Sequence, residues 1–147
     1  MSSVLPQNSA DESLAASMQR AEDAVAELAA DYSNWALADV KRAEEAFALV
    51  KNEPDKRPAH LEALYRATHD MKGQGGSFGY PLITKIGQSL CRYLHSGAIG
   101  ETHFPVIQAH IGALRLILEK SIKGDGGVMG GKLVAKLEAL TGLPKLG

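Results

Sequence analysis

The fold follows most clearly from residues 58–79, PAHLEALYRATHDMKGQGGSFG. The apolar positions of this segment recur in steps of three and four, the spacing that places side chains on one face of an α-helix. These positions are Leu61, Leu64, Thr68, Met71, Gly75 and Phe78. Pro58 suits a first helical turn, where its missing N–H is not needed. The run Gly79-Tyr80-Pro81 predicts the end of the helix, so we expect one helix with a single buried face.

Three further segments repeat this helical period on either side. They cover residues 33–51, 81–95 and 102–123. Their buried stripes are predicted to be Ala36, Val40, Ala43, Phe47 and Val50 in the first, Ile83, Ile86, Leu90 and Leu94 in the second, and Phe104, Ile107, Ile111, Leu114 and Leu118 in the third. No segment alternates apolar and polar residues convincingly, as a half-buried strand would. The sequence therefore predicts an all-α fold, an antiparallel up-and-down four-helix bundle over residues 31–123.

The two ends of the chain are predicted to add an extra N-terminal helix and a short C-terminal helix to this bundle. Residues 1–8 are expected to be flexible, and residues 9–30 to form a helix that opens with a Ser-x-x-Glu capping box. The apolar stripe of that helix is Leu14, Met18, Ala21, Val25 and Leu28. Residues 124–147 are expected to begin as a flexible glycine-rich linker through Gly131 and to end in a short helix over residues 133–140.

Length and composition fit one globular domain. The chain has 147 residues, of which 45% are hydrophobic and 22% are charged. Its net charge of -1 offers no general attraction to nucleic acid or to an anionic membrane, so neither is an expected partner. The single cysteine, Cys91, cannot form an internal disulfide, and the sequence shows no signal peptide and no apolar run that could span a bilayer. We therefore expect a soluble protein of the cytoplasm.

The second half of residues 58–79 has glycine where helix-forming residues would normally stand. Four glycines lie between residues 73 and 79. Each interior glycine costs a helix up to about 1 kcal/mol relative to alanine. At about 100° per residue, the residues that fall together on a flank beside the buried stripe are His69, Lys72, Gly73 and Gly76. His69 is therefore expected to point to solvent with little bulk around it.

This flank suits phosphoryl chemistry. Neutral imidazole is a nucleophile and the free group has a pKa of about 6.5, so an exposed histidine can attack an activated phosphoryl group. Lys72, three residues on, would offset the negative charge that the ring then carries. Gly73 and Gly76 would leave room for the active site of another protein. Gln74 could hydrogen-bond to a phosphoryl oxygen, although it lies nearer the opposite flank.

A family resemblance rests on the run HDMKG at residues 69–73, followed by Gly76 and Gly79. Together with the helical lead over residues 61–67, this run resembles the histidine-containing phosphotransfer (HPt) domains of two-component phosphorelays. The resemblance covers the predicted bundle from about residue 33 to residue 123.

The resemblance implies a function and its partners. His69 would accept a phosphoryl group from an aspartate of one receiver domain and pass it to an aspartate of another, which makes the chain a phosphocarrier rather than an enzyme. The receivers would belong to a hybrid histidine kinase and a response regulator. They would supply Mg²⁺ and the acidic pocket, so no cofactor is expected on this chain. The family's lysine and glycines correspond to Lys72, Gly73 and Gly76, whereas Gln74 stands where the family often has a small residue.

Other interpretations of the same residues are open at the level of sequence. Tyr65 lies on the side of the buried stripe toward His69, where it either packs in the core or lines a docking surface together with Arg66. The main alternative function is a helical adaptor that binds a partner through this face without phosphoryl transfer. The chain could also dimerise through the apolar stripe of residues 9–30, alongside either function.

The four other histidines, His60, His95, His103 and His110, are interpreted as solvated surface residues. His103 and His110 lie seven residues apart and so share a helical face, which with His95 nearby suggests metal ligands. No carboxylate or cysteine at ligand spacing supports that interpretation, and no metal site is predicted.

Overall fold

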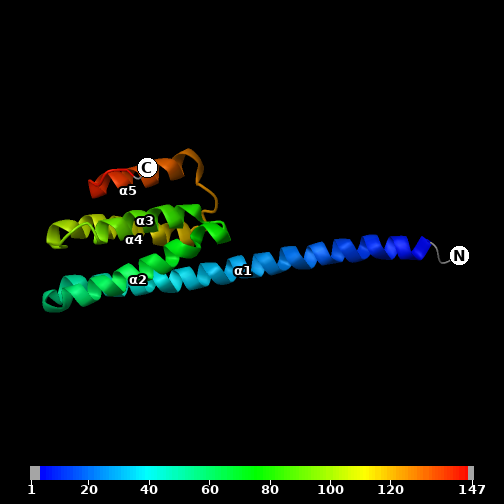
Figure 1. Cartoon of the computed structure of the whole chain (residues 1–147), viewed down its shortest axis with the longest axis horizontal. Helices are drawn as coiled ribbons and strands as arrows, with labels where there is room; N and C mark the ends of the chain where they lie inside the picture. Colours follow the sequence, from blue (N-terminus) through cyan, green and yellow to red (C-terminus); the bar gives the residue numbers. More distant parts are fainter. Residues whose placement is uncertain (1–3, 146–147) are drawn as a thin grey trace. The chain divides into compact units, whose positions relative to one another are not determined.

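The protein is all-helical in the residues that the structure describes. A computed structural model describes the backbone of residues 4–145 and the side chains of residues 13–145. As Figure 1 shows, its α-helices are α1 (Val4–Asn52), α2 (Arg57–Gly75), α3 (Pro81–Leu94), α4 (Phe104–Glu119) and α5 (Gly127–Thr141). Short 3-10 turns cover Pro54–Lys56, Gly76–Phe78 and Glu101–His103. Residues 4–145 contain no β-strand, which confirms the predicted fold class.

The chain divides into two compact units, Met1–Tyr32 and Ser33–Gly147. The candidate functional site lies entirely in the second unit. Within residues 4–145, none of the helices is apolar over a length that would cross a membrane.

Helix α1 is longer than the sequence pattern indicated. Residues 9–30 and 33–51, which were predicted as two helices, belong to one continuous helix, so the predicted break between them is wrong. The physical reason is the absence of a breaker, because no glycine or proline stands between residues 9 and 51.

The start of α1 also differs from the prediction. The helix begins at Val4, with Pro6 in its first turn, where proline is tolerated. The capping box predicted at Ser9 is therefore wrong, since Ser9 lies inside the helix. Of the residues 1–8 that were predicted to be flexible, the last five are helical and the first three lie outside the described residues.

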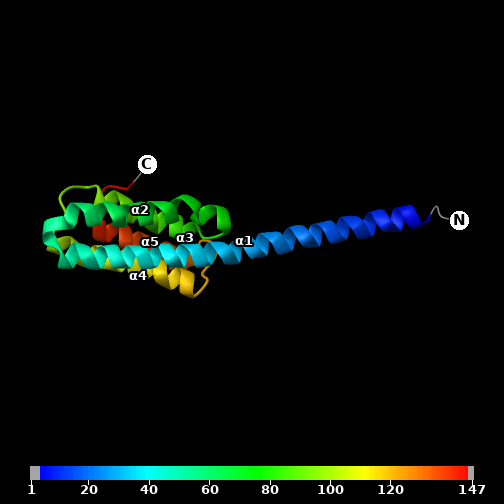
Figure 2. The same ribbon diagram turned by 90° about the horizontal axis from the view of Figure 1, so that it is seen from below.

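The second unit buries most of each stripe that the sequence predicted. Helix α2 packs on α3, α3 packs on α4 and α5, and α4 packs on α5; Figure 2 shows these helices from a second side. The fully buried side chains include Val40, Ala43 and Val50 of α1, Leu64, Ala67 and Met71 of α2, Ile83, Ile86 and Leu90 of α3, and Ile107, Ile111 and Leu114 of α4. Three predicted core residues, Leu61, Phe78 and Phe104, are only half-buried.

The part of α1 that belongs to the second unit contacts α4 through both apolar and charged side chains. The rings of Phe47 and Phe104 pack edge to face, with their centroids 5.6 Å apart. Further along α4, the Arg115 guanidinium donates to both carboxylate oxygens of Glu44, with N···O distances of 2.8 and 2.5 Å. These carboxylate contacts raise the pKa of Arg115, so the guanidinium stays charged.

Helix α5 begins earlier than predicted. The prediction of a flexible linker through Gly131 is wrong from Gly127 onward, because α5 starts there. Gly130 makes this start possible, since a Cβ there would lie 2.1 Å from the carbonyl oxygen of Asp125. Val134 and Leu137 bury the inner face of α5. Helix α5 is thus docked, and beyond it the Arg92 guanidinium of α3 donates to the carbonyl oxygen of Pro144 at 2.9 Å.

His110 lies in the core, so its interpretation as a solvated residue is wrong. Its side chain is fully buried between α3 and α4. Nδ1 lies 2.8 Å from the carbonyl oxygen of Val106, and Nε2 lies 2.8 Å from Oγ of Ser89. Because a carbonyl only accepts, Nδ1 carries the proton, and Nε2 of the neutral ring accepts from the Ser89 hydroxyl. Burial lowers the pKa of His110, which favours this neutral form.

Candidate functional site

His69 projects from the exposed side of α2, as the sequence predicted. The neighbouring residue Thr68 is fully buried, and its hydroxyl donates to the carbonyl oxygen of Leu64 at 2.9 Å. One residue on, the backbone turns the imidazole of His69 out of the core into solvent. Within the described residues, the His69 ring makes no hydrogen bond and no ion pair, and it stacks loosely on Tyr65 with ring centroids 5.9 Å apart. An exposed ring without a hydrogen bond leaves its nitrogens free to react.

A hollow opens beside His69 on the side that faces α1. Its lining residues are Trp35, Asp39, His69, Asp70, Gly73 and Gln74. Trp35 leaves 53% of its surface exposed, which is unusual for the largest apolar side chain. Gln74 lies in the same hollow as the histidine. The site therefore combines a nucleophile, amide and carboxylate groups, and an exposed aromatic ring.

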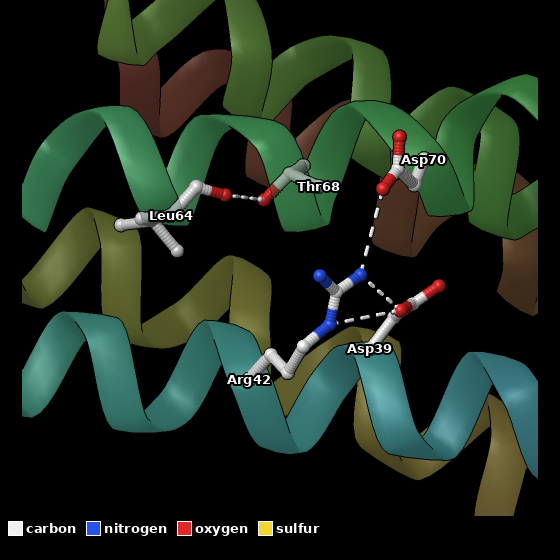
Figure 3. A network of polar contacts seen from close by, with 5 residues as sticks. All are labelled: Asp39, Arg42, Leu64, Thr68 and Asp70. Atoms are coloured by element: carbon white, nitrogen blue, oxygen red, sulfur yellow. Dashed lines mark hydrogen bonds and ion pairs between the residues drawn. The ribbon is translucent and has the colours of Figure 1, made fainter.

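Two carboxylates of this hollow are held by one arginine. Figure 3 shows Arg42 of α1 between Asp39 of its own helix and Asp70 of α2. The guanidinium donates twice to Asp39, once from Nε at 3.1 Å, and its Nη2 lies 3.5 Å from Oδ2 of Asp70. The hydrogen bond to Asp39 is the main reason that the pKa of Arg42 is raised. Arg42 thus offsets negative charge directly beside His69.

The side of His69 that faces α3 is packed rather than hollow. The Tyr65 ring stacks closely on His95, with centroids 3.8 Å apart and an interplanar angle of 11°. Tyr65 thus contacts a histidine ring on α2 and another at the end of α3. Lys72 lies on the same side, where its Cβ sits 2.9 Å from the position that a Cβ on Gly87 would take. Its stem lies against α3.

The glycines after His69 differ in what surrounds them. Gly73 is exposed, and a Cβ there would meet no atom within 4 Å. Gly76 is also exposed, and its nearest neighbour would be Oγ1 of Thr84 at 3.8 Å. Gly75 is buried, and a Cβ there would lie 2.8 Å from both Oγ1 of Thr84 and the carbonyl oxygen of Tyr80. Of these three glycines, only Gly75 is required by packing within the described residues.

Thr84 of α3 holds the end of the helix that carries His69. Its hydroxyl accepts from the backbone N–H of Gly76 at 2.9 Å and donates to the carbonyl oxygen of Lys72 at 3.0 Å. These two bonds satisfy backbone groups at the C-terminal end of α2, where the helical ladder stops. The segment that bears His69, Lys72 and Gly73 is therefore fixed to α3.

The structure brings several of the sequence-predicted site residues together, places Arg66 apart, and leaves Gly76 outside the lining of the hollow beside His69. Tyr65, Lys72, Gly73 and Gln74 surround His69, on one side or the other. Arg66 instead pairs with Glu62 at 3.2 Å and lines a different hollow together with Arg42.

Sequence reasoning missed the contributions of α1 and α3. Trp35, Asp39 and Arg42 come from α1, and Thr84 and His95 from α3. For Trp35 a signal existed, because it is the only tryptophan and lies beside rather than on the stripe of its helix. The remaining residues, Asp39, Arg42, Thr84 and His95, reach the site because of which helices pack side by side. The apolar stripe of one helix does not specify its neighbours.

Cys91 is a poor candidate for the reactive group. It is buried, and this burial raises the pKa of its thiol to about 11. The thiolate is the nucleophilic form, so Cys91 stays unreactive at neutral pH. Among the described residues, no three histidine, cysteine, aspartate or glutamate side chains are grouped so that they could hold a metal ion.

Comparison with known proteins adds no assignment: no protein-family model, no curated protein and no solved structure matches the chain.

Proposed function

We propose that this chain is an HPt phosphocarrier, with His69 as the phosphoacceptor. The observation that carries the proposal is an exposed imidazole without a hydrogen bond, beside a glycine that the fold does not need. Gly73 weakens its helix by roughly 0.5–1 kcal/mol relative to alanine. No contact within the described residues repays that cost, so the space above Gly73 serves something outside the chain.

The fold that we propose for this function is an antiparallel four-helix bundle. Its helices are the part of α1 after Ser33, together with α2, α3 and α4. The remainder of α1 and the docked α5 are additions to this bundle. Short connections between consecutive helices favour antiparallel neighbours.

The proposed reaction is a reversible transfer between nitrogen and oxygen. A ring nitrogen of His69 uses its lone pair to form an N–P bond with the phosphoryl group of a receiver aspartate. The acyl O–P bond breaks, and the aspartate leaves as a carboxylate with the bonding electrons. In the return step, the carboxylate of a second receiver attacks phosphorus, and the imidazole leaves. The chain is unchanged after both steps and acts as a carrier.

The charges around His69 fit this role. Phosphorylation places a dianionic group close to Asp70 and Asp39, which would repel it. Arg42 already pairs with both carboxylates and so reduces that repulsion. On the other side of the ring, Lys72 offers an ammonium group on a stem held against α3. Gln74 can donate an amide hydrogen to a phosphoryl oxygen from within the hollow.

The proposed partners are receiver domains of a hybrid histidine kinase and of a response regulator in the cytoplasm. They dock on the hollow beside His69, with Trp35 as an exposed aromatic contact and Gly73 and Gly76 as the points of closest approach. Mg²⁺ and the acidic pocket belong to the receivers.

The experiment is a transfer assay with phosphorylated receiver domains. Wild-type chain should acquire phosphate that is labile in acid and stable in alkali, and should pass it to a second receiver. His69→Gln should acquire none. His95→Gln is the matched control, because it removes another exposed histidine of the same region, and it should still be labelled. A chain that binds receivers but is never labelled would instead support the adaptor function.

A further inference from the structure

The first unit of the chain leaves an apolar stripe uncovered. Leu14, Met18, Ala21, Val25 and Leu28 follow one another in steps of four and three along α1. The four larger side chains leave between 49% and 66% of their surface exposed. An α-helix gains most of its stability in a protein from burying such a face. Nothing within the first unit covers this stripe, so it is available for a contact with another helix.

The spacing indicates which kind of contact this is. Steps of four and three average 3.5 residues, and a strict repeat of seven makes helices wind around each other as a left-handed coiled coil. In heptad terms, Met18 and Val25 take the a positions, and Leu14, Ala21 and Leu28 take the d positions. Val25 at an a position and Leu14 and Leu28 at d positions fit the preference for two strands. The partner of this stripe is thus one other helix with the same repeat.

The flanking residues fit a second copy of the same segment in parallel orientation. In a parallel pair, the g position of one helix faces the following e position of the other. Ser17 then faces Glu22, and Ala24 faces Ala29, so no like charges meet. An antiparallel pair that sets Ala21 against Val25 would bring the two Glu22 carboxylates together.

The exposed area is large enough for such a pair. The five stripe residues and the small side chains beside them would bury on the order of 1,000 Å² over two copies, which is near the lower limit for a specific interface. Ala21, at the central d position, contributes little to this buried area because its side chain is small. We expect a reversible dimer rather than a permanent one.

We infer that the chain forms a parallel dimer through the stripe Leu14, Met18, Ala21, Val25 and Leu28 of α1. This inference rests on the first unit alone and is independent of the proposed phosphoryl transfer. Because Glu22, Asp23 and Glu27 outnumber Arg20 between Leu14 and Leu28, the two copies repel each other at long range. Added salt should therefore strengthen the dimer, whereas it would weaken binding of the same segment to a basic partner.

The first test is disulfide trapping in the full chain with Cys91→Ala. Leu28→Cys lies at a d position, so two copies in a parallel pair face each other and should cross-link under mild oxidation. Ala30→Cys is the matched control, because it lies two residues on and on the opposite face of the helix, and it should stay monomeric. A mixture of Met18→Cys and Leu28→Cys chains that forms the mixed disulfide in preference to the Leu28→Cys pair would overturn the parallel arrangement.

The second test is sedimentation equilibrium of the unmodified chain over a wide concentration range. The wild type should show a monomer–dimer equilibrium that shifts toward the dimer as salt is added. Val25→Glu places a carboxylate in the seam and should shift the equilibrium toward monomer at least tenfold, while Ala26→Glu adds the same charge on the outer face and should leave it nearly unchanged. Glutamate is a good helix former, so neither change should unfold α1. A wild type that stays monomeric at all concentrations would overturn the inference.

Discussion

Helix α2 carries a packed side and an open side only two residues apart in the sequence. On the packed side, a Cβ on Gly75 would collide with Thr84 and with the backbone of Tyr80. On the open side, a Cβ on Gly73 would meet nothing within 4 Å. Glycine thus occurs in the same helix in two different environments. Gly75 is required by packing within the fold, whereas packing does not require glycine at position 73, where we propose that a partner approaches.

His110 and His69 show the same difference between a packed and an open environment. His110 lies in the core, and the groups around it, Ser89 and Val106, hold one tautomer of a neutral ring. His69 is exposed, and no hydrogen bond holds either of its nitrogens within the described residues. Burial makes the first a structural residue, and exposure leaves the second available for chemistry.

The largest expected effect on stability comes from a substitution on the packed side of α2. Gly75→Ala should destabilise the protein by about 1–3 kcal/mol, the usual cost of overpacking, because a backbone carbonyl cannot move aside as a flexible side chain can. Urea unfolding of both proteins measures this difference. A variant as stable as the wild type would show that α2 and α3 are not as close at this point as the structure places them.

The next effect concerns the pH dependence of stability. The pKa of His110 is lowered in the folded state, so below about pH 6.5 the unfolded chain binds the proton more readily. Stability should therefore fall as the pH drops from about 7 to 5. Urea unfolding over this range should show a flatter dependence for His110→Gln than for the wild type. Equal slopes would contradict the buried, neutral state of His110.

A smaller effect of opposite sign is expected on the open side. Gly73→Ala should stabilise the protein by roughly 0.5–1 kcal/mol, because alanine favours the helix and no atom obstructs its methyl group. The same change should slow transfer from a receiver, and Gly73→Leu should slow it further. Thermal unfolding and transfer rates are measured on the same samples. If stability rises while transfer is unaffected, the open side is not a docking surface.

The smallest effect on stability is expected at Arg42. Its ion pairs are exposed, so Arg42→Gln should change the free energy of unfolding by less than about 1 kcal/mol. Transfer should suffer more, because Asp39 and Asp70 would then face the phosphorylated ring without a compensating charge. Lys41→Gln, one residue earlier on the same helix, is the matched control for loss of one positive charge. Equal transfer rates for both variants would remove Arg42 from the site.

The sequence predicts those parts of the fold that burial controls. The stripes from Val40 to Val50, from Leu64 to Met71 and from Ile107 to Leu114 are correct because each apolar position faces the same core. His110 lies on the last of these stripes, three residues after Ile107, so its burial was visible in the spacing.

The rest of the fold and part of the site depend on contacts that no local pattern encodes. Whether α1 breaks near residue 31 depends on weak local preferences, and the start of α5 depends on how Gly130 fits against Asp125. For the site, spacing placed Lys72 and Gly73 beside His69. It could not supply Arg42, which reaches Asp70 only because α1 and α2 are neighbours.

We propose that His69, and no other residue, carries the phosphoryl group. The most direct measurement is the position of the phosphate in wild-type chain after incubation with a phosphorylated receiver, found by mass spectrometry of peptides kept at alkaline pH. We expect a single modified peptide that contains His69 and no modified peptide from His69→Gln. Phosphate on another residue, or label that persists in His69→Gln, would contradict this proposal.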